Sequence, residues 1–424
     1  MPERKRVLLV FPYAVPPGGG EGLAAHALQA LQDDHDVSIA CYRPPDFETL
    51  NRHFATALRA ERFTLHTVPR WLTWTLERQP TPQALARVSV LEAFVRRLSR
   101  GRRFDVYLSL VNEMSLPERG IQYVHFPRID SGGAPAGRLP RVPGALAFYR
   151  ATCGWIGGAT PERLRRNVTL ANSAYTASLF QTLHGVPARV VHPPAPGHFA
   201  ARPWSERKNR VVCVGRILPG KDVPRVVEIV GRLRALGHEL SLVVVGAWSC
   251  SSSYRRDVGR LLERHRAWVS HEPDLSRDEL TRLLAESRYG IHAMVGEPFG
   301  MAVAEMQRAG CIAFVPRVGG PSEIVGHEPR VVYGSVDEAV AHADEVLRDP
   351  RLQAKLHTHA LARGDLFTVE RFTAQIREHV DRFARERIGG RVPKPATIPE
   401  GRHGSAGASR ATKGGLGGRP EPPN

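Results

Sequence analysis

The sequence predicts an α/β protein built from two doubly wound parallel-sheet domains in tandem. Short apolar runs alternate with helix-forming segments from end to end, the pattern of layered α/β domains with parallel sheets. This alternation stops at a polar, proline-containing stretch near the middle of the chain and then restarts. Ligands of such sheets bind beyond the carboxyl ends of the strands, so we expect the functional site in the cleft between the two halves.

The first half carries the apolar runs expected of a buried sheet. We expect strands at 6–11, 36–42, 104–110, 121–126, 167–173 and 188–194, with helices at 22–32 and 173–185. The run at 6–11 is preceded by basic residues, as in a signal peptide. It is short and followed by prolines, however, so we interpret it as a buried first strand.

The second half begins after a linker at 195–209, which is rich in turn-forming and charged residues. We expect strands at 210–217, 240–248, 268–273, 288–294 and 311–317, and helices after Asp222 and Gly300. An amphipathic helix follows at 368–388. We therefore divide the chain into domains at 1–195 and 196–365, a C-terminal helix at 366–388 and a disordered, Gly/Pro-rich tail at 389–424.

Composition narrows the class of protein. The net charge is +17, but the arginines are dispersed and no nucleic-acid-binding motif accompanies them, so we expect no nucleic-acid partner. The five cysteines are scattered singly, which argues against a structural zinc site and a disulfide framework and favours a cytoplasmic protein. The chain contains no apolar run long enough to span a membrane.

A glycine-rich segment, Gly18 to Gly22, follows the first expected strand. Backbone at Gly19 and Gly20 could approach a phosphate closely, with a helix start behind it. The segment is not a dinucleotide fingerprint, because Leu23 stands where the third glycine belongs, and no P-loop lysine follows. A tight turn is an equally good account of these glycines.

Two cations follow the first strand of the second half. Arg216 and Lys221 are five residues apart across a proline-glycine turn, at an edge where strand ends face the other domain. They could converge on one anion, the arginine as a fork and the lysine as a point charge. The alternative is two solvated loop cations.

The segment 296–310 places two glutamates around an apolar helix start. The N–H groups of Phe299, Gly300 and Met301 could receive an anion, since the first turn of a helix leaves its donors unpaired. Glu305 lies deeper on the apolar stripe, where it could hold a ribose diol. The alternative is a glutamate at the edge of the stripe that reaches water or pairs with Arg308.

These motifs together resemble the retaining family-4 glycosyltransferases. The resemblance rests on the glycine loop, Arg216-x4-Lys221 and Glu297-x7-Glu305 with Phe299-Gly300 between them, and it covers about 5–387. It implies a GT-B fold, with two Rossmann-like domains facing across a cleft and a C-terminal helix crossing back to the N-domain. The segments 122–127, 171–173, 191–194 and 292–297 also resemble the branch of lipid-linked-oligosaccharide mannosyltransferases.

The resemblance assigns roles to individual residues. It implies that Glu305 holds the ribose of a nucleotide-sugar donor and that Arg216 and Lys221 neutralise its diphosphate, helped by the Gly300 helix start and by Gly19-Gly20. Glu297 would contact sugar hydroxyls. His125, at the end of an N-domain strand, would lie by the reacting carbon, and its alternative is a packed core histidine.

The implied reaction is retaining hexosyl transfer, of mannose or glucose type, to a glycan, a lipid-linked or a small-molecule acceptor. No cofactor and no metal are expected, because cations and helix dipoles would stabilise the departing diphosphate. Sugar phosphorolysis, sugar-nucleotide epimerisation and simple polyanion binding on the same scaffold stay open as alternatives.

One further segment, 145–158, bears Phe148, Tyr149, Trp155 and Ile156, yet is too short to span a bilayer and is interrupted by Arg150. It suggests a protein that rests peripherally on the anionic inner face of a membrane. A buried helix of the N-domain is the alternative.

Overall fold

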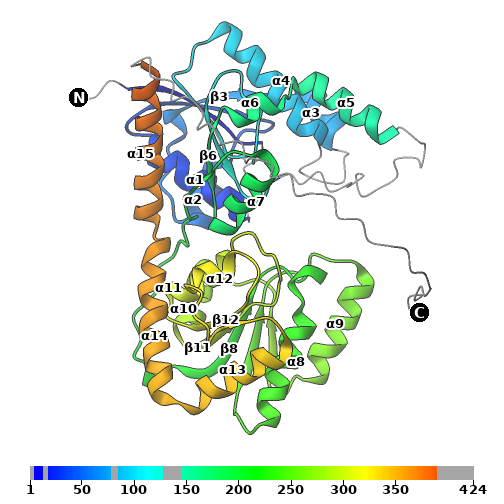
Figure 1. The fold of residues 1–424 in the computed structure, drawn as a ribbon, viewed down its shortest axis with the longest axis vertical. Helices are drawn as coiled ribbons and strands as arrows, with labels where there is room; N and C mark the ends of the chain where they lie inside the picture. The colour runs from blue at the N-terminus through cyan, green and yellow to red at the C-terminus, as the bar shows by residue number, and fades with distance from the viewer. Residues whose placement is uncertain (1–3, 13–17, 78–84, 128–144, 389–424) are drawn as a thin grey trace, which may run out of the picture.

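The computed structural model describes residues 4–12, 18–77, 85–127 and 145–388, and Figure 1 shows two α/β domains joined by a long helical segment. Each domain contains one parallel sheet with helices packed against it, which confirms the predicted fold class. The tail at 389–424, expected to be disordered, lies outside the described residues.

The N-terminal sheet has the strand order β3-β2-β1-β4-β5-β6-β7, with every neighbouring pair parallel. The sequence did not predict β3, because this edge strand alternates apolar and polar residues and buries only Phe63 fully. Its strands are β1 Arg6–Val10, β2 Asp36–Cys41, β3 Phe63–Thr67, β4 Val106–Ser109, β5 Ile121–Val124, β6 Val168–Ala171 and β7 Arg189–Val190.

The first helix begins earlier than the sequence suggested. The N–H of Gly22 donates to the carbonyl of Gly18 at 3.1 Å, so Gly19 and Gly20 form the first turn of α1 and not a loop before it. The N-domain helices are α1 Gly19–Leu31, α2 Phe47–Phe54, α3 Arg70–Glu77, α4 Leu85–Gly101, α5 Ala145–Gly157, α6 Pro161–Arg165 and α7 Ala174–His184.

The C-terminal sheet has the order β10-β9-β8-β11-β12-β13, again parallel. It begins inside the expected linker, since β8 starts at Lys208 and a single turn of 3-10 helix precedes it. Its strands are β8 Lys208–Val214, β9 Ser241–Val245, β10 Val269–Glu272, β11 Ser287–Ile291, β12 Ile312–Pro316 and β13 Val332–Tyr333.

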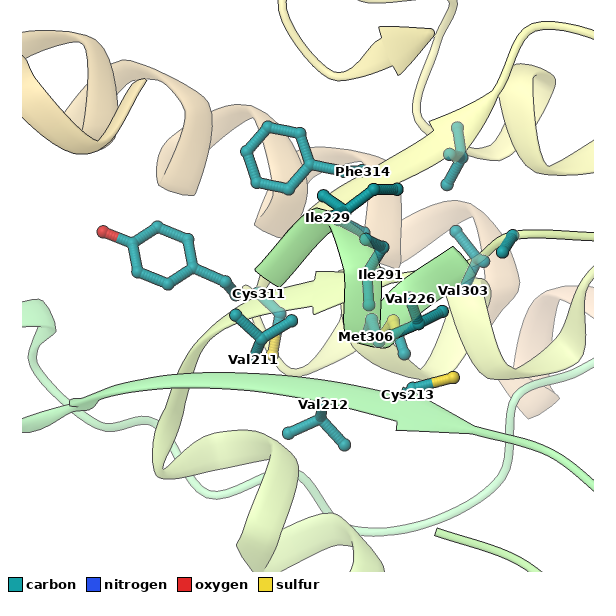
Figure 2. Close-up of a cluster of buried hydrophobic side chains, with 14 of the residues drawn as sticks. Val211, Val212, Cys213, Val226, Ile229, Ile291, Val303, Met306, Cys311 and Phe314 are labelled. Carbon is teal, nitrogen blue, oxygen red and sulfur yellow. The ribbon is translucent and has the colours of Figure 1, made fainter. Parts of the chain in front are cut away.

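The core of this domain fixes the helix that follows Gly300. Figure 2 shows Val303 and Met306 of that helix, α11, among side chains of β8, β11 and α8, so one face of α11 is held by apolar packing. The helices are α8 Val223–Ala235, α9 Ser252–Arg264, α10 Arg277–Ala285, α11 Met301–Arg308, α12 Gly320–Ile324, α13 Val336–Arg348 and α14 Pro350–Gly364.

The last helix, α15 (Val369–Ile388), crosses back to the N-domain along α1, as predicted (Figure 1). Its inward face belongs to the same apolar cluster as β1 and α1, through Phe372, Ile376, Val380, Phe383 and Ala384. The segment that enters the second domain is hydrogen-bonded to the segment that leaves it, because the N–H of Ala195 donates to the carbonyl of Phe367 at 2.9 Å. The C-terminal segment therefore helps to set how the two domains meet.

Candidate functional site

The carboxyl ends of β8 and β11 bring Lys221 and Glu297 into a direct ion pair. Lys221 lies in the turn after β8, and Asp222 ends that turn in the left-handed region (φ 48°) while its side chain caps α8 at the N–H of Arg225. Lys221 is therefore placed by a turn that α8 holds from behind. Both side chains of the pair are mostly buried.

Glu297 is a carboxylate held in its charged form. Burial alone would raise its pKa, but hydrogen bonding from His292 and Lys221 and the Lys221 charge outweigh this and lower the pKa to about 2. The Nε2 atom of His292 lies 3.5 Å from the same carboxylate oxygen. Burial in turn lowers the pKa of His292. Glu297 thus remains a hydrogen-bond acceptor across the physiological pH range.

Arg216 does not join this pair. It is exposed, and its charge acts on Glu21 in the first turn of α1 on the opposite domain. Burial raises the pKa of Glu21, while its own backbone N–H and the Arg216 charge oppose that rise. Arg216 and Lys221 therefore flank the same domain interface from different positions.

The loop that carries Glu297 is anchored to a second loop by backbone contacts. The N–H of Gly296 donates to the carbonyl of Val318, and the N–H of Gly320 donates to that of Glu297 at 2.8 Å. A Cβ at Gly319 would lie 2.8 Å from the Glu297 carbonyl, and one at Gly320 would lie 2.4 Å from a neighbouring carbonyl. Only glycines allow this approach, and sequence reasoning did not single them out.

Helix α11 starts directly after this loop. Gly300 has φ 104°, which favours glycine, and its carbonyl accepts the N–H groups of Val303 and Ala304. The N–H groups of Met301 and Ala302, in the first turn, have no partner within the helix. An anion at this position would be stabilised by the helix dipole.

Glu305 is buried on α11, and it pairs with Arg277. Arg277 is the first residue of α10, so the partner comes from a different helix and is not Arg308, the partner in the alternative that the sequence left open. Arg308 instead donates to the carbonyl of Ala195 at the domain crossing. The pairing satisfies a buried carboxylate whose side chain is only 8% exposed.

On the N-domain, His125 follows β5 and is clamped through its backbone. Asn112 Oδ1 accepts the N–H of His125 at 2.7 Å, and Asn172 Nδ2 donates to its carbonyl at 2.7 Å. The ring Nε2 lies 3.2 Å from the carbonyl of Leu110, which can only accept, so Nε2 carries the proton. Burial lowers the pKa of His125, although the Leu110 carbonyl opposes this shift. The ring is therefore a neutral imidazole that offers Nδ1 as an acceptor.

The start of α1 lies between the N-domain histidine and the C-domain helix. A Cβ at Gly19 would come within 3.4 Å of Met301 Cγ, and one at Gly20 within 4.0 Å of His125 Cε1. The structure thus brings Gly19, Gly20, His125 and Met301 together from segments far apart in the sequence.

A second set of contacts joins the domains beside this site. Ser173 caps α7 at the N–H of Thr176 and also donates its hydroxyl to the carbonyl of Pro298 at 2.6 Å. Glu323 of α12 accepts the N–H of Ala174 at 2.6 Å and lies 2.7 Å from His192 Nε2.

The sequence carried a partial signal for these contacts. The segments 171–173 and 191–194 resembled family motifs, but no role was assigned to Ser173 or His192, and Glu323 was missed. The ring of His192 stacks on that of Phe299, and both meet the ring of Phe367 edge-to-face, with centroids 5.3–5.9 Å apart. The loop that carries Glu297 is therefore in contact with both domains.

Comparison with known proteins finds a family match in the C-terminal half of the chain. Residues 196–363 match the model of the family "Glycosyl transferases group 1". Among curated proteins, the chain is similar to the GDP-Man:Man(3)GlcNAc(2)-PP-Dol alpha-1,2-mannosyltransferase of Mus musculus, 26% identical over 45% of this chain and 42% of that protein. The Homo sapiens enzyme of the same name is 27% identical over 49% and 46%. The chain thus spans less than half the length of these relatives.

Solved structures show the same fold over nearly the whole chain. HepE from Anabaena, in complex with UDP, has a TM-score of 0.63 at 14% identity and covers 89% of this chain and 100% of its own. WaaG, a glycosyltransferase involved in lipopolysaccharide biosynthesis, has a TM-score of 0.62 at 16% identity, covering 89% and 99%. These likenesses establish the two-domain GT-B fold.

Proposed function

Because residues 196–363 match the model of the glycosyl transferases group 1 family, we propose that this protein is a nucleotide-sugar-dependent glycosyltransferase that moves a mannosyl group from GDP-mannose with retention of anomeric configuration. The observation that carries the proposal is the grouping of Lys221, Glu297 and the α11 start at one sheet edge, opposite His125. The choice of GDP-mannose is supported by the names of the curated relatives.

The donor would lie against the C-domain. The diphosphate would meet the N–H groups at the start of α11 together with the charges of Lys221 and Arg216. Glu305 would accept hydrogen bonds from the ribose, sharing its carboxylate with Arg277. Glu297, kept ionised by Lys221, would accept hydrogen bonds from sugar hydroxyls.

The reaction would proceed as follows. The bond between C1 of the sugar and the diphosphate oxygen breaks, and C1 forms a new bond to the acceptor hydroxyl oxygen on the same face. The acceptor proton passes to the departing phosphate oxygen. Positive charge on the sugar is stabilised by the nearby carboxylate and the negative leaving group by the cations. Neutral His125 Nδ1 would accept a hydrogen bond from a sugar hydroxyl.

The acceptor would be a lipid-linked sugar at a membrane surface, a choice supported by the -PP-Dol acceptor in the relatives' names. A glycan or a small molecule is the other acceptor class that the site would take. The enzyme would then act at the inner face of the membrane without crossing it. No described helix is long and apolar enough to cross a membrane.

A donor screen followed by product analysis tests the proposal. GDP should raise the unfolding temperature more than UDP or ADP, since a ligand at about 100 times its dissociation constant adds roughly 2.7 kcal/mol to the free energy of unfolding. Radiolabelled GDP-mannose should then pass its sugar to a lipid extract, and NMR should show an axial anomeric bond in the product. Release of mannose 1-phosphate, of an epimerised nucleotide sugar, or DNA binding without nucleotide binding would each contradict it.

A further inference from the structure

Two neighbouring helices of the N-domain carry all the exposed tryptophan and phenylalanine side chains of the described residues. Trp71 and Trp74 on α3 are 72% and 58% exposed, while Phe148 and Trp155 on α5 are 75% and 84% exposed. Large aromatic side chains are costly to leave in water when they cluster, and such clusters mark surfaces that are covered by something else. We call these four residues, with Ile156, the aromatic face.

Both helices turn one face inward and the aromatic face outward. On α5, Cys153 and Gly157 are buried, and the Tyr149 hydroxyl accepts the N–H of Ala86, so this stripe packs on α4. On α3, Thr73 and Leu76 are buried, while Trp71 and Trp74, three residues apart, share the outer face. The aromatic side chains thus form the solvent-facing side of two helices whose other faces pack against the N-domain.

The two helices meet at the start of α4. The guanidinium of Arg87 donates to the carbonyl of Leu76 at the end of α3, and the adjacent Ala86 N–H donates to Tyr149 of α5 at 3.2 Å. Further along, Arg96 of α4 donates to the carbonyl of Ile156 at 2.6 Å. Figure 1 shows α3, α4 and α5 together on the side of the N-domain away from α15. The two helices that carry the aromatic side chains therefore lie beside the same helix, on one side of the N-domain.

The charge around this face has one predominant sign. The exposed charged side chains described on α3, α4, α5 and α6 are the arginines at 70, 97, 100 and 165 against the single acid Glu162. Tryptophan rings favour the interface between water and acyl chains, and arginines beside them favour anionic headgroups. Helices of 8 and 13 residues are too short to cross a bilayer, so they would lie on it.

We propose that the aromatic face docks the protein on an anionic phospholipid surface, with Trp71, Trp74, Phe148 and Trp155 inserted at the depth of the headgroups. The inference deepens the proposed function and rests on it in one respect, namely that docking would bring the site close to a lipid-linked acceptor. The contact itself does not require transfer of a sugar. The C-domain, which would bind the soluble donor, contributes none of the aromatic face.

Binding to vesicles tests the inference with matched variants. The full chain is mixed with vesicles of phosphatidylcholine alone, or of phosphatidylcholine and phosphatidylglycerol in equal parts, and the bound fraction is measured by flotation. The double variant Trp71→Ala, Trp155→Ala should lower affinity for anionic vesicles at least about tenfold. Its control, Leu236→Ala with Leu361→Ala, removes two exposed apolar side chains of the C-domain and should not change it.

A second pair of variants separates charge from apolar contact. Arg70→Gln with Arg165→Gln should weaken binding and reduce its dependence on salt, whereas Arg256→Gln with Arg260→Gln, on exposed α9, should not. Brominated lipid should quench the fluorescence of Trp71, Trp74 and Trp155 but not that of Trp204, Trp248 and Trp268 in the C-domain, because only side chains in the bilayer contact bromine.

The outcomes separate two questions: what covers the aromatic face, and whether the protein transfers a sugar. Equal affinity of the parent and the Trp71→Ala, Trp155→Ala variant would overturn the inference, as would equal binding to neutral and anionic vesicles. A parent that dimerises in sedimentation, and becomes monomeric in that variant without binding vesicles, would show that a second copy covers the face instead. If vesicles bind as expected but no sugar is transferred from any nucleotide sugar, the docking surface stands and the proposed function fails.

Discussion

Lys221 and Glu297 form an ion pair across the carboxyl ends of β8 and β11 in the second domain. The lysine comes from the turn before α8 and the glutamate from the loop before α11, so the pair joins two loops that are 76 residues apart. His292 lies behind the carboxylate at 3.5 Å. Lys221, which would face the donor diphosphate, and Glu297, which would face its sugar, thus hold each other in position.

This pair should make stability depend on pH in the acid range. The pKa of Glu297 is lowered from 4.5 to about 2, so its contribution is complete above pH 4.5 and is lost as pH falls toward 2. The shift corresponds to on the order of 3 kcal/mol of the free energy of unfolding. Denaturant unfolding between pH 6 and pH 2.5 should show this loss in the parent but not in Glu297→Gln. Parallel pH profiles for the two proteins would contradict it.

Glu305→Gln should weaken nucleotide binding at least tenfold, because two charge-assisted hydrogen bonds of about 1.5–3 kcal/mol each would be weakened. Calorimetric titration with GDP measures this affinity. The matched variant is Arg277→Gln, which removes the partner and leaves the carboxylate. It should keep or raise GDP affinity, since Glu305 then faces the ribose without a competing cation.

The same two variants test the structural alternative. If Glu305 serves only to pair with Arg277, both substitutions should lower the unfolding temperature by similar amounts and leave GDP affinity unchanged. That result would assign Glu305 to the core of the C-domain and remove it from the donor site.

Ser173→Ala should disturb the site through the domain contact. It removes the cap of α7, which costs about 1 kcal/mol, and also the hydrogen bond to Pro298 that holds the loop carrying Glu297. The control Ser335→Ala removes the cap of α13 inside the C-domain at a similar cost. We expect both variants to lose similar stability but only Ser173→Ala to lower kcat/KM, severalfold or more. Equal kinetics in the two variants would show that the contact has no functional effect.

Turnover should not require a divalent metal. The diphosphate would be met by the charges of Arg216 and Lys221 and by the first-turn N–H groups of α11. Initial rates should therefore be the same with and without EDTA. Complete loss of activity in EDTA, restored by manganese, would contradict this prediction.

The sequence by itself determined the fold class and most of the motifs. Continuous apolar runs such as those of β1, β8 and β9 are buried on both faces, so their composition alone identifies them as strands. The edge strands β3 and β13 were not predicted, because an edge strand has only part of its surface buried or is too short to show a pattern. The helix α15 followed from its amphipathic pattern, whereas its crossing back to the N-domain was implied only by the family resemblance.

Only the tertiary structure decided which side chains meet. Pairing of Glu305 with Arg277, of Lys221 with Glu297 and of Glu323 with His192 joins residues 28, 76 and 131 positions apart, and no local periodicity encodes such distances. The exposure of Trp71 and Trp74 was likewise decided only by the tertiary structure. Their exposure depends on which face of α3 packs against α4, and an apolar residue near a helix surface is equally compatible with core or solvent until the neighbouring helix is placed. Local sequence fixes the backbone pattern, whereas contacts between distant residues require the whole chain to fold.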